Sequence, residues 1–377
     1  MLHFSYNCHM KQVFIYILFT ALACKKDAVQ NDLLKPAAGG ETLQSIAAIP
    51  IGASVNPGDL TGTFGYKKIV AQEMSSITAE NVMKWGSLQP KQDDFEFADA
   101  DKIAAFAQSY QKRLHGHNLC WYTGNPDWVN KFQGDAAAWD SLLKTHITTV
   151  VSHFKGQAAS WDVVNEAFQD NNSGDYRNLQ TEANNDDGCI WYRHIGKDYV
   201  AHAFQYAHAA DPAAILFYND YNQEKFTNKL KAILDMVADF KARNIPIGGL
   251  GLQMHIDIST SNDSIAAALK ACAATGLKIH ISELDICVNL TWDKTATYTA
   301  DLQKKQADKY AFVVQQYLQL VPKEQQYGIT MWNVGDGDSW WNQAPLLRHD
   351  WPLLFDSAYK RKPAYDAFAA ALKNGNK

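Results

Sequence analysis

The chain has 377 residues, of which 47% are hydrophobic and 20% charged, and its formal net charge is −5. This composition supplies enough apolar side chains for an ordinary buried core and does not indicate a disordered chain. The small negative charge and the lack of a basic stripe argue against nucleic acid or an anionic membrane as a partner, because both bind clustered Lys and Arg. The 11 Trp, 17 Tyr and 17 Phe could line a binding groove, although most are expected to fill the core.

The N-terminus carries the pattern of an export signal rather than that of a folded element. Met10-Lys11-Gln12 precedes an apolar run, Val13 to Phe19, which is followed by Thr20-Ala21-Leu22-Ala23-Cys24. The run is too short to span a membrane, and a charge followed by an apolar core and small residues is typical of a signal peptide. We predict a signal over residues 1–24, with translation starting at Met10. Cys24 is predicted to be the lipid anchor of a bacterial envelope lipoprotein, and plain secretion is the alternative.

Residues 25–48 are polar, contain Pro36 and Gly39-Gly40, and are predicted to form a tether before a catalytic domain at residues 49–374. Four cysteines remain beyond the anchor: Cys120, Cys189, Cys272 and Cys287. Their irregular spacing matches no zinc motif. Export permits disulfides without requiring them, so buried free thiols are an equal alternative. We expect neither a metal nor a cofactor.

Short apolar runs alternate with amphipathic stretches through the rest of the chain. The runs predict strands at Ile49–Val55, Ser76–Asn81, Arg113–Trp121, Ser160–Ala167, Ile215–Tyr221, Gly249–Ile256, Lys278–Ile286 and Gln326–Val334. The stretches predict helices at Asp99–Tyr110, Ala137–Phe154, Trp191–Ala210, Lys229–Arg243, Ser264–Thr275, Thr299–Leu320 and Pro363–Leu372. This alternation predicts an α/β protein with a single (β/α)8 TIM barrel. An open doubly wound sheet is the rival fold, but Gly52-Ala53-Ser54-Val55 is not a Gly-rich phosphate loop.

Two predicted strands end in carboxylates. The fourth strand ends in Trp161-Asp162-Val163-Val164-Asn165-Glu166 and the seventh in His280-Ile281-Ser282-Glu283-Leu284-Asp285. The active site of this fold forms at the carboxyl ends of the strands, and a buried charge there needs a fixed partner. Glycosidic cleavage needs a protonated carboxyl group beside the leaving oxygen and an ionised one beneath the sugar. Like charge and partial burial are expected to keep one of the two Glu side chains protonated near neutral pH.

The chain resembles glycoside hydrolase family 10, the endo-β-1,4-xylanases, over nearly all of residues 49–370. The pieces that carry the resemblance occur in order, each at a predicted strand end or the loop after it. They are Ile77-Thr78-Ala79-Glu80-Asn81-Val82-Met83-Lys84-Trp85, Gly116-His117-Asn118-Leu119-Cys120-Trp121, Trp161-Asp162-Val163-Val164-Asn165-Glu166-Ala167, Asn219-Asp220-Tyr221-Asn222, Gln253-Met254-His255, Ser282-Glu283-Leu284-Asp285-Ile286, Trp332-Asn333-Val334 and Pro352-Leu353-Leu354-Phe355-Asp356.

The resemblance implies retaining hydrolysis of β-1,4-xylosidic bonds, with xylan and xylooligosaccharides as ligands. Glu166 matches the acid/base of the family and Glu283 its nucleophile, and their carboxyl groups are expected about 5–5.5 Å apart. His255 and Asp285 match the pair that orients and tunes the nucleophile, because a carboxylate fixes the tautomer of a histidine. The structural alternative is that both Glu side chains serve only in ion pairs.

The resemblance also implies a set of substrate-binding residues. Asn165 matches the residue that binds the sugar 2-hydroxyl. Further positions are Glu80, Asn81 and Lys84 on the glycone side, His117 and Trp121 around the sugar that is cleaved, Gln253 near it, Tyr221 on the leaving-group side, and Trp332 and Trp340 as aromatic floor and wall. The alternatives are a solvated face for Glu80 and Lys84, and core packing for the rings.

The sequence departs from the family pattern at two places. Tyr122-Thr123-Gly124-Asn125 stands where the family usually has a His followed by polar residues, and Asn333 stands where it usually has Gly. Both departures bear on the glycone side. The loop at residues 169–189, which is rich in Asn and Asp, bears on the leaving-group side.

Three other functions are alternatives to a xylanase. A barrel that acts on β-glucan or mannan is the nearest, but a wall at Trp340 would crowd a hydroxymethyl group, so we expect at least about tenfold better turnover of xylo- than of cello-oligosaccharides. A non-catalytic carbohydrate-binding barrel would not need a buried carboxylate pair. A metal-dependent hydrolase lacks a ligand cluster to complement His115 and His117.

Overall fold

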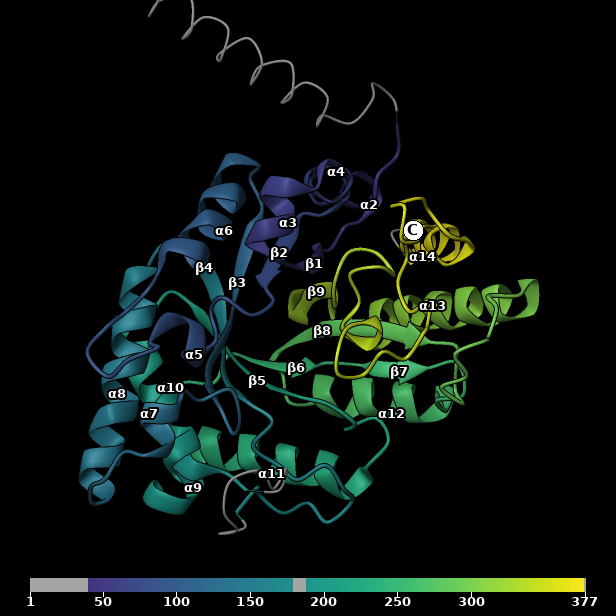
Figure 1. Ribbon diagram of the computed structural model, residues 1–377. Coiled ribbons are helices and arrows are strands. Elements are labelled where there is room, and N and C mark those ends of the chain that lie inside the picture. The colour runs from purple at the N-terminus through teal and green to yellow at the C-terminus, as the bar shows by residue number, and fades with distance from the viewer. Residues whose placement is uncertain (1–39, 179–187, 376–377) are drawn as a thin grey trace, which may run out of the picture.

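The computed structural model describes residues 40–178 and 188–375. Within them a closed parallel sheet consists of β1 (Ile51–Val55), β2 (Ser76–Ala79), β3 (Arg113–Trp121), β4 (Ala158–Asn165), β5 (Ile215–Asp220), β6 (Gly249–Leu252), β7 (His255–Asp257), β8 (Lys278–Cys287) and β9 (Gln326–Met331). Strand β1 pairs with both β2 and β9, which closes the sheet. Both β6 and β7 pair with β8, so they form one interrupted strand of an eight-stranded barrel. The predicted (β/α)8 fold is confirmed (Figure 1).

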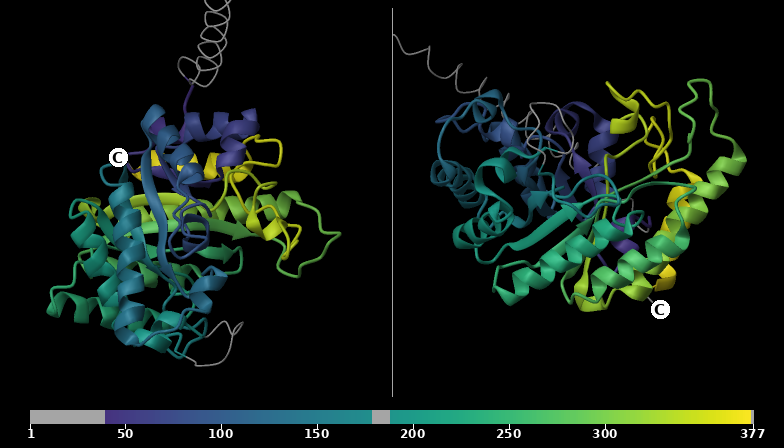
Figure 2. Two further views of the ribbon diagram at one scale, coloured as in Figure 1. Left: turned by 60° about the vertical axis from the view of Figure 1, so that its left-hand side comes forward. Right: turned by 90° about the horizontal axis from the view of Figure 1, so that it is seen from below.

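Helices surround the barrel (Figures 1 and 2). They are α2 (Leu43–Ile46), α3 (Pro57–Gly62), α4 (Phe64–Glu73), α5 (Trp85–Leu88), α6 (Ala98–Ser109), α7 (Asp127–Asn130), α8 (Ala136–His153), α9 (Ile190–Ile195), α10 (Tyr199–Ala210), α11 (Thr227–Ala242), α12 (Asn262–Ala273), α13 (Ala300–Leu320) and α14 (Pro363–Gly375). Side-chain caps fix where several helices begin: Asp135 accepts a hydrogen bond from the backbone of Ala138, and Thr299 accepts one from that of Leu302.

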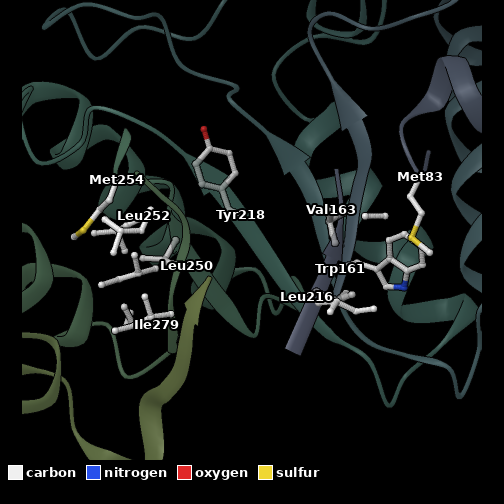
Figure 3. Packing of buried hydrophobic residues seen from close by; sticks show 14 of the residues in the cluster. Met83, Trp161, Val163, Leu216, Tyr218, Leu250, Leu252, Met254 and Ile279 are labelled. Atoms are coloured by element: carbon white, nitrogen blue, oxygen red, sulfur yellow. The ribbon is translucent and has the colours of Figure 1, made fainter. Parts of the chain in front are cut away.

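The core has two parts. Outside the sheet, the strands pack apolar side chains against the helices; Figure 3 shows Leu250 with Ile279, and Trp161 with Leu216. Inside the barrel, near the amino ends of the strands, four aromatic rings contact one another: His115, Phe217, His280 and Tyr327. A Cβ on Gly249 would lie 2.1 Å from the Phe217 ring, so this position has no room for a side chain. The strands are buried on both faces, and several of the side chains that point into the barrel, such as His115 and His280, are polar.

One predicted helix is interrupted. The stretch Trp191–Ala210 was expected to be continuous, but α9 ends at Ile195 and α10 begins at Tyr199. Gly196 lies between them with φ of 87°, a conformation that glycine adopts without steric cost and that ends a helix. The other six predicted helices are confirmed to within a few residues.

The predicted boundary between tether and domain at residue 49 is wrong. Residues 43–46 form α2, Leu43 is fully buried, and its backbone N–H donates to Glu73 Oε2 at 2.8 Å. Polar composition suggested a tether, whereas the buried Leu43 side chain, its hydrogen bond to Glu73 and the hydrogen bonds from Gln44 to two backbone carbonyls of α4 fix this segment on the barrel. Residues 25–39 of the predicted tether and the predicted signal lie outside the described residues.

Cys120, Cys189, Cys272 and Cys287 are buried free thiols, which decides between the two alternatives left by their spacing. In the described part of the chain, no helix combines the length and the apolar character needed to cross a membrane.

Glu73 joins three segments, which gives a stability prediction. Its buried carboxylate accepts hydrogen bonds from the Leu43 backbone, from Tyr365 Oη at 2.9 Å and from Arg361 at 2.6 Å. We expect Glu73→Ala to lower the free energy of unfolding by about 2–4 kcal/mol, because the buried donors lose their partner. Urea unfolding would measure this, and Lys102→Ala, which removes only an exposed ion pair with Asp99, is the control. Equal losses in both variants would contradict it.

Candidate active site

A cleft of about 700 Å³ opens at the carboxyl ends of the barrel strands. It brings together thirteen of the fourteen predicted site residues, namely Glu80, Asn81, Lys84, His117, Trp121, Asn165, Glu166, Tyr221, Gln253, His255, Glu283, Trp332 and Trp340. The fourteenth, Asp285, lies behind His255 and is fully buried. Tyr122 and the segment 343–346 complete the lining.

Glu166 follows β4 and has neutral hydrogen-bond donors around it. Its Oε1 accepts from Asn165 Nδ2 and from Gln253 Nε2, both at 2.8 Å, and its Oε2 accepts from Trp121 Nε1 at 2.8 Å. Its backbone has φ of 58°, a left-handed conformation uncommon for a non-glycine residue, and is held by a hydrogen bond to the Asn219 carbonyl. Burial raises the pKa of Glu166, and the charges of Asp220 and Glu283 raise it further against the opposing hydrogen bonds.

Glu283, in β8, faces a different environment. Its Oε1 accepts from Asn219 Nδ2 at 2.7 Å, and its Oε2 lies 3.3 Å from His255 Nε2. Burial by itself raises the pKa of this carboxyl group, but the hydrogen bond from His255 and the positive potential of His255 and His117 outweigh burial, so that the net pKa is lowered. The two carboxyl groups are therefore shifted in opposite directions within one cleft.

His255 is held between two carboxylates. Its Nδ1 lies 2.8 Å from Asp285 Oδ2, and the same oxygen accepts from Trp340 Nε1 at 2.9 Å. Burial lowers the pKa of His255, but Asp285 and Glu283 raise it to about 10, so the ring is an imidazolium at neutral pH. This arrangement gives Glu283 a charged donor, and the Asp285 carboxylate also holds the Trp340 ring in place.

Asn219, in β5, is a site residue that sequence reasoning did not select. Its amide nitrogen donates to Asn165 Oδ1 at 2.9 Å as well as to Glu283, and its Oδ1 accepts from Ser282 Oγ at 2.6 Å. Asn219 thereby joins the donors of Glu166 to those of Glu283. The sequence feature that could have identified Asn219 is a buried Asn at a predicted strand end, in the stretch Asn219-Asp220-Tyr221-Asn222.

At another side of the cleft, Lys84 donates to Asn81 Oδ1 at 2.9 Å and lies over the rings of Trp121 and Trp332, 5.0 and 5.9 Å from their centroids. Burial lowers the pKa of Lys84 and raises that of Glu80. Glu80 and Lys84 are half-buried and Asn81 is exposed, and all three side chains line the cleft. They form a polar corner with fixed donors and acceptors.

Asn333, one of the departures from the family pattern, lies in this corner. It is buried and has φ of 86°, a conformation in which glycine is the usual residue. Its Oδ1 accepts from the Trp340 backbone N–H at 3.0 Å, and its side chain hydrogen-bonds Glu80, which opposes the rise in the pKa of that carboxyl group. The departure therefore adds a link between Glu80 and Trp340.

Arg177 is a second residue that sequence reasoning missed. It is fully buried, donates to the Glu166 carbonyl at 3.0 Å and to Tyr221 Oη at 3.0 Å, and lies 4.0 Å from the centroid of the Tyr122 ring. It fixes Tyr221 at the edge of the cleft and gives Tyr122, the other departure, a cation–π partner. No sequence signal marked Arg177, because its partners are distant in sequence.

His115 and His117 both contact Asp162, at 3.0 and 2.9 Å. These contacts hold the pKa of Asp162 well below its usual range, although burial alone would raise it. Both histidines thus have the Asp162 carboxylate as a partner. Among residues 40–178 and 188–375, no group of three His, Cys, Asp or Glu side chains is arranged to hold a metal ion.

Several known proteins are similar to this chain in sequence. The chain is 37% identical over 347 residues to the endo-β-1,4-xylanase Xyn10C of Cellvibrio japonicus, covering 86% of the chain and 56% of that protein. It is 36% identical over 324 residues to an endo-1,4-β-xylanase of Geobacillus stearothermophilus, covering 84% of the chain and 93% of that enzyme. It is also 37% identical over 334 residues to the exoglucanase XynX of Acetivibrio thermocellus, covering 85% of the chain and 28% of that protein. The chain thus spans only part of two of these relatives.

Solved structures of xylanases are similar to this chain in fold. Native xylanase 10C of Cellvibrio japonicus superposes with a TM-score of 0.83 at 36% identity, covering 90% of this chain and 74% of that one. Native xylanase 10B of Thermotoga maritima superposes with a TM-score of 0.79 at 34% identity, covering 89% of this chain and 98% of that one. The profile of glycosyl hydrolase family 10 matches residues 41–371. The chain belongs to glycosyl hydrolase family 10.

Proposed function

We propose that the chain is an endo-1,4-β-xylanase that hydrolyses xylan with retention of anomeric configuration. The observation that carries the proposal is the pair Glu166 and Glu283, which line one cleft with their pKa values shifted in opposite directions. A raised pKa suits a proton donor, and a lowered one suits an ionised nucleophile. The relatives' names supply the substrate class.

The mechanism is a double displacement. A carboxylate oxygen of Glu283 attacks the anomeric carbon while the bond from that carbon to the leaving oxygen breaks, and Glu166 gives its proton to the leaving oxygen. The product is a glycosyl-enzyme and a shortened chain. Glu166, now ionised, removes a proton from a water molecule whose oxygen attacks the same carbon, and Glu283 leaves as a carboxylate. The carboxyl separation of about 5–5.5 Å remains a prediction of this mechanism.

The neighbouring groups fit these steps. Asn165 is proposed to donate to the sugar 2-hydroxyl, with Asn219 fixing its orientation. His255, charged and tied to Asp285, keeps Glu283 ionised before the attack. Glu80, Asn81 and Lys84 are proposed to bind xylose hydroxyls on the glycone side, and Tyr221 the leaving-group side. Trp332 and Trp340 are proposed to contact sugar faces, as aromatic rings commonly do.

Export is a further part of the proposal. The charged start, apolar run and Cys24 of the N-terminal segment support a lipoprotein of the bacterial envelope, or otherwise a secreted enzyme. Mass spectrometry of the mature protein tests this: a lipid-modified Cys24 at its N-terminus supports anchoring, and an unprocessed chain that begins before residue 24 contradicts it.

The pH dependence of kcat/KM follows from the two shifts. Activity is expected to fall on the acid side as Glu283 gains a proton, below the ordinary carboxyl pKa of 4.5, and on the basic side as Glu166 loses its proton, above 4.5. In His255→Gln the charged donor is gone, so the acid limb should move to higher pH by about one unit or more. His202→Gln, far from the cleft on α10, is the control. An unmoved acid limb in His255→Gln contradicts the tuning role.

Azide distinguishes the two carboxyl groups. We expect Glu166→Ala to lose about 10²–10⁴-fold in kcat on xylan, but much less in kcat/KM on an aryl xylobioside, whose leaving group needs no proton. The kcat on the aryl xylobioside should still fall, because the second step has lost its general base. Azide, which needs no general base, should restore turnover of that glycoside by Glu166→Ala and give the β-glycosyl azide. Glu283→Ala should be almost inactive and give the α-azide. NMR of the products measures both, and an inverted product from the wild type would rule out double displacement.

A β-glucanase is the second candidate, because one relative is named an exoglucanase. The wall at Trp340, fixed by Asp285 and Asn333, favours xylose, since a hydroxymethyl group would meet it. We expect kcat/KM for aryl xylobioside to exceed that for aryl cellobioside at least about tenfold, or roughly 1.4 kcal/mol. Trp340→Ala should narrow this ratio. Equal rates with the wild type would favour the glucanase.

A further inference from the structure

Exposed apolar side chains gather beside the cleft. Among the described residues four large hydrophobic side chains are exposed, and three of them lie on two loops: Leu290 at 43% and Trp292 at 41% between β8 and α13, and Leu347 at 55% between β9 and α14. Figure 2 shows both loops at the end of the barrel toward which the strands point. We call Leu290, Trp292, Trp341, Leu347 and Arg348 the Trp292 platform.

The two loops are joined by buried polar groups. The Asp350 carboxylate accepts from the backbone N–H groups of Val288 and Asn289, at 2.9 and 3.0 Å, and pairs with Arg348 at 3.0 Å. Arg348 in turn donates to the Asn289 carbonyl, and Asn289 Nδ2 donates to the His349 carbonyl. The platform is therefore preorganised, so that binding does not cost the ordering of a loose loop.

The platform presents an indole ring that packing has already fixed. Arg348 lies 4.9 Å from the ring centroid of Trp292 and 4.8 Å from that of Trp341, and the two indoles meet edge to face at 6.2 Å. Trp292 has φ of 58° and Leu347 has φ of 46°, both uncommon for bulky residues. Such strain points to function when the surroundings hold it in place.

The platform is continuous with the cleft. The ring of Trp341 packs at a tilt of 36° against that of the cleft residue Trp340, with ring centroids 4.2 Å apart, and Leu346, next to Leu347, lines the cleft. The path from Trp340 through Trp341 to Trp292 is short enough for a few sugar units to span. A flat ring matches the apolar face of a pyranose.

We propose that the Trp292 platform binds pyranose rings of a β-1,4-linked polysaccharide beyond the cleft, and so holds the polymer while the carboxyl pair cuts it. This inference rests on the proposed function, since the same polymer must enter the cleft. Short substrates that fill only the cleft do not reach Trp292. The platform therefore acts on polymers and leaves the turnover of short glycosides unchanged.

The experiment compares polymer with short substrate. We expect Trp292→Ala to lower kcat/KM on soluble xylan about three- to tenfold, mainly through KM, and to leave kcat/KM on aryl xylobioside within about twofold. Trp292→Phe, which keeps a ring, should retain most of the polymer activity. Phe64→Ala, which removes the fourth exposed apolar side chain, is the matched control. In an inactive Glu283→Ala background, Trp292→Ala should also migrate faster than its parent through native gels that contain xylan.

Each outcome of this experiment either supports or overturns the inference. Equal loss on polymer and on aryl xylobioside would mean that Trp292 supports the cleft itself, and no loss on either would mean that the platform binds no sugar; both overturn the inference. A change in sedimentation between wild type and Trp292→Ala would assign the surface to self-association and overturn it as well. If the wild type cuts no xylan, the proposed function fails first. If it cuts xylan and Trp292→Ala equals the wild type, only the platform fails.

Discussion

The structure depends on one electrostatic constraint: two carboxyl groups are buried in the same cleft, and their hydrogen-bond donors differ in charge. Glu166 receives only neutral amide and indole donors, whereas Glu283 receives a charged imidazolium. Within a low-dielectric cleft, that difference shifts the two pKa values apart, because a charged donor stabilises an anion more than a neutral one does. Asn219 touches both systems, so their geometry is fixed jointly rather than residue by residue.

The barrel provides this arrangement through strand order and local irregularity. Adjacent strands β4 and β5 carry Asn165 and Asn219 at paired positions. The register shifts between Asp162 and Val164, and again between Ile281 and Leu284 in β8. Such irregularities re-aim side chains next to active sites. With the left-handed backbone of Glu166, they turn side chains from separate strands toward one cleft.

The sequence predicted the barrel well because short, largely apolar strands alternate with amphipathic helices along the chain, and this alternation is easy to recognise. It missed α3 and α4, where polar and apolar residues alternate with no clear helical stripe, and the break at Gly196. Among site residues, the strand-end carboxylates could be predicted from position and chemistry. Arg177 could not be predicted, because it acts through hydrogen bonds to Glu166 and Tyr221 that exist only in the folded chain. Asn219 stood in a recognised stretch, but nothing in the sequence indicated that it bridges two strands.

Asn333 shows what a departure from a family pattern can mean. From sequence alone it was a substitution at a position that usually holds glycine, with an effect of unknown direction. In the folded chain it joins Glu80 to Trp340, and Trp340 in turn donates a hydrogen bond to Asp285 and packs at a tilt against Trp341. The loop residues Asn333 and Trp340 at the edge of the cleft are thus connected, through Asp285, to the histidine that contacts Glu283. Loops tolerate change more readily than strands, so substrate preference can vary at this edge while the carboxyl pair beneath it stays constant.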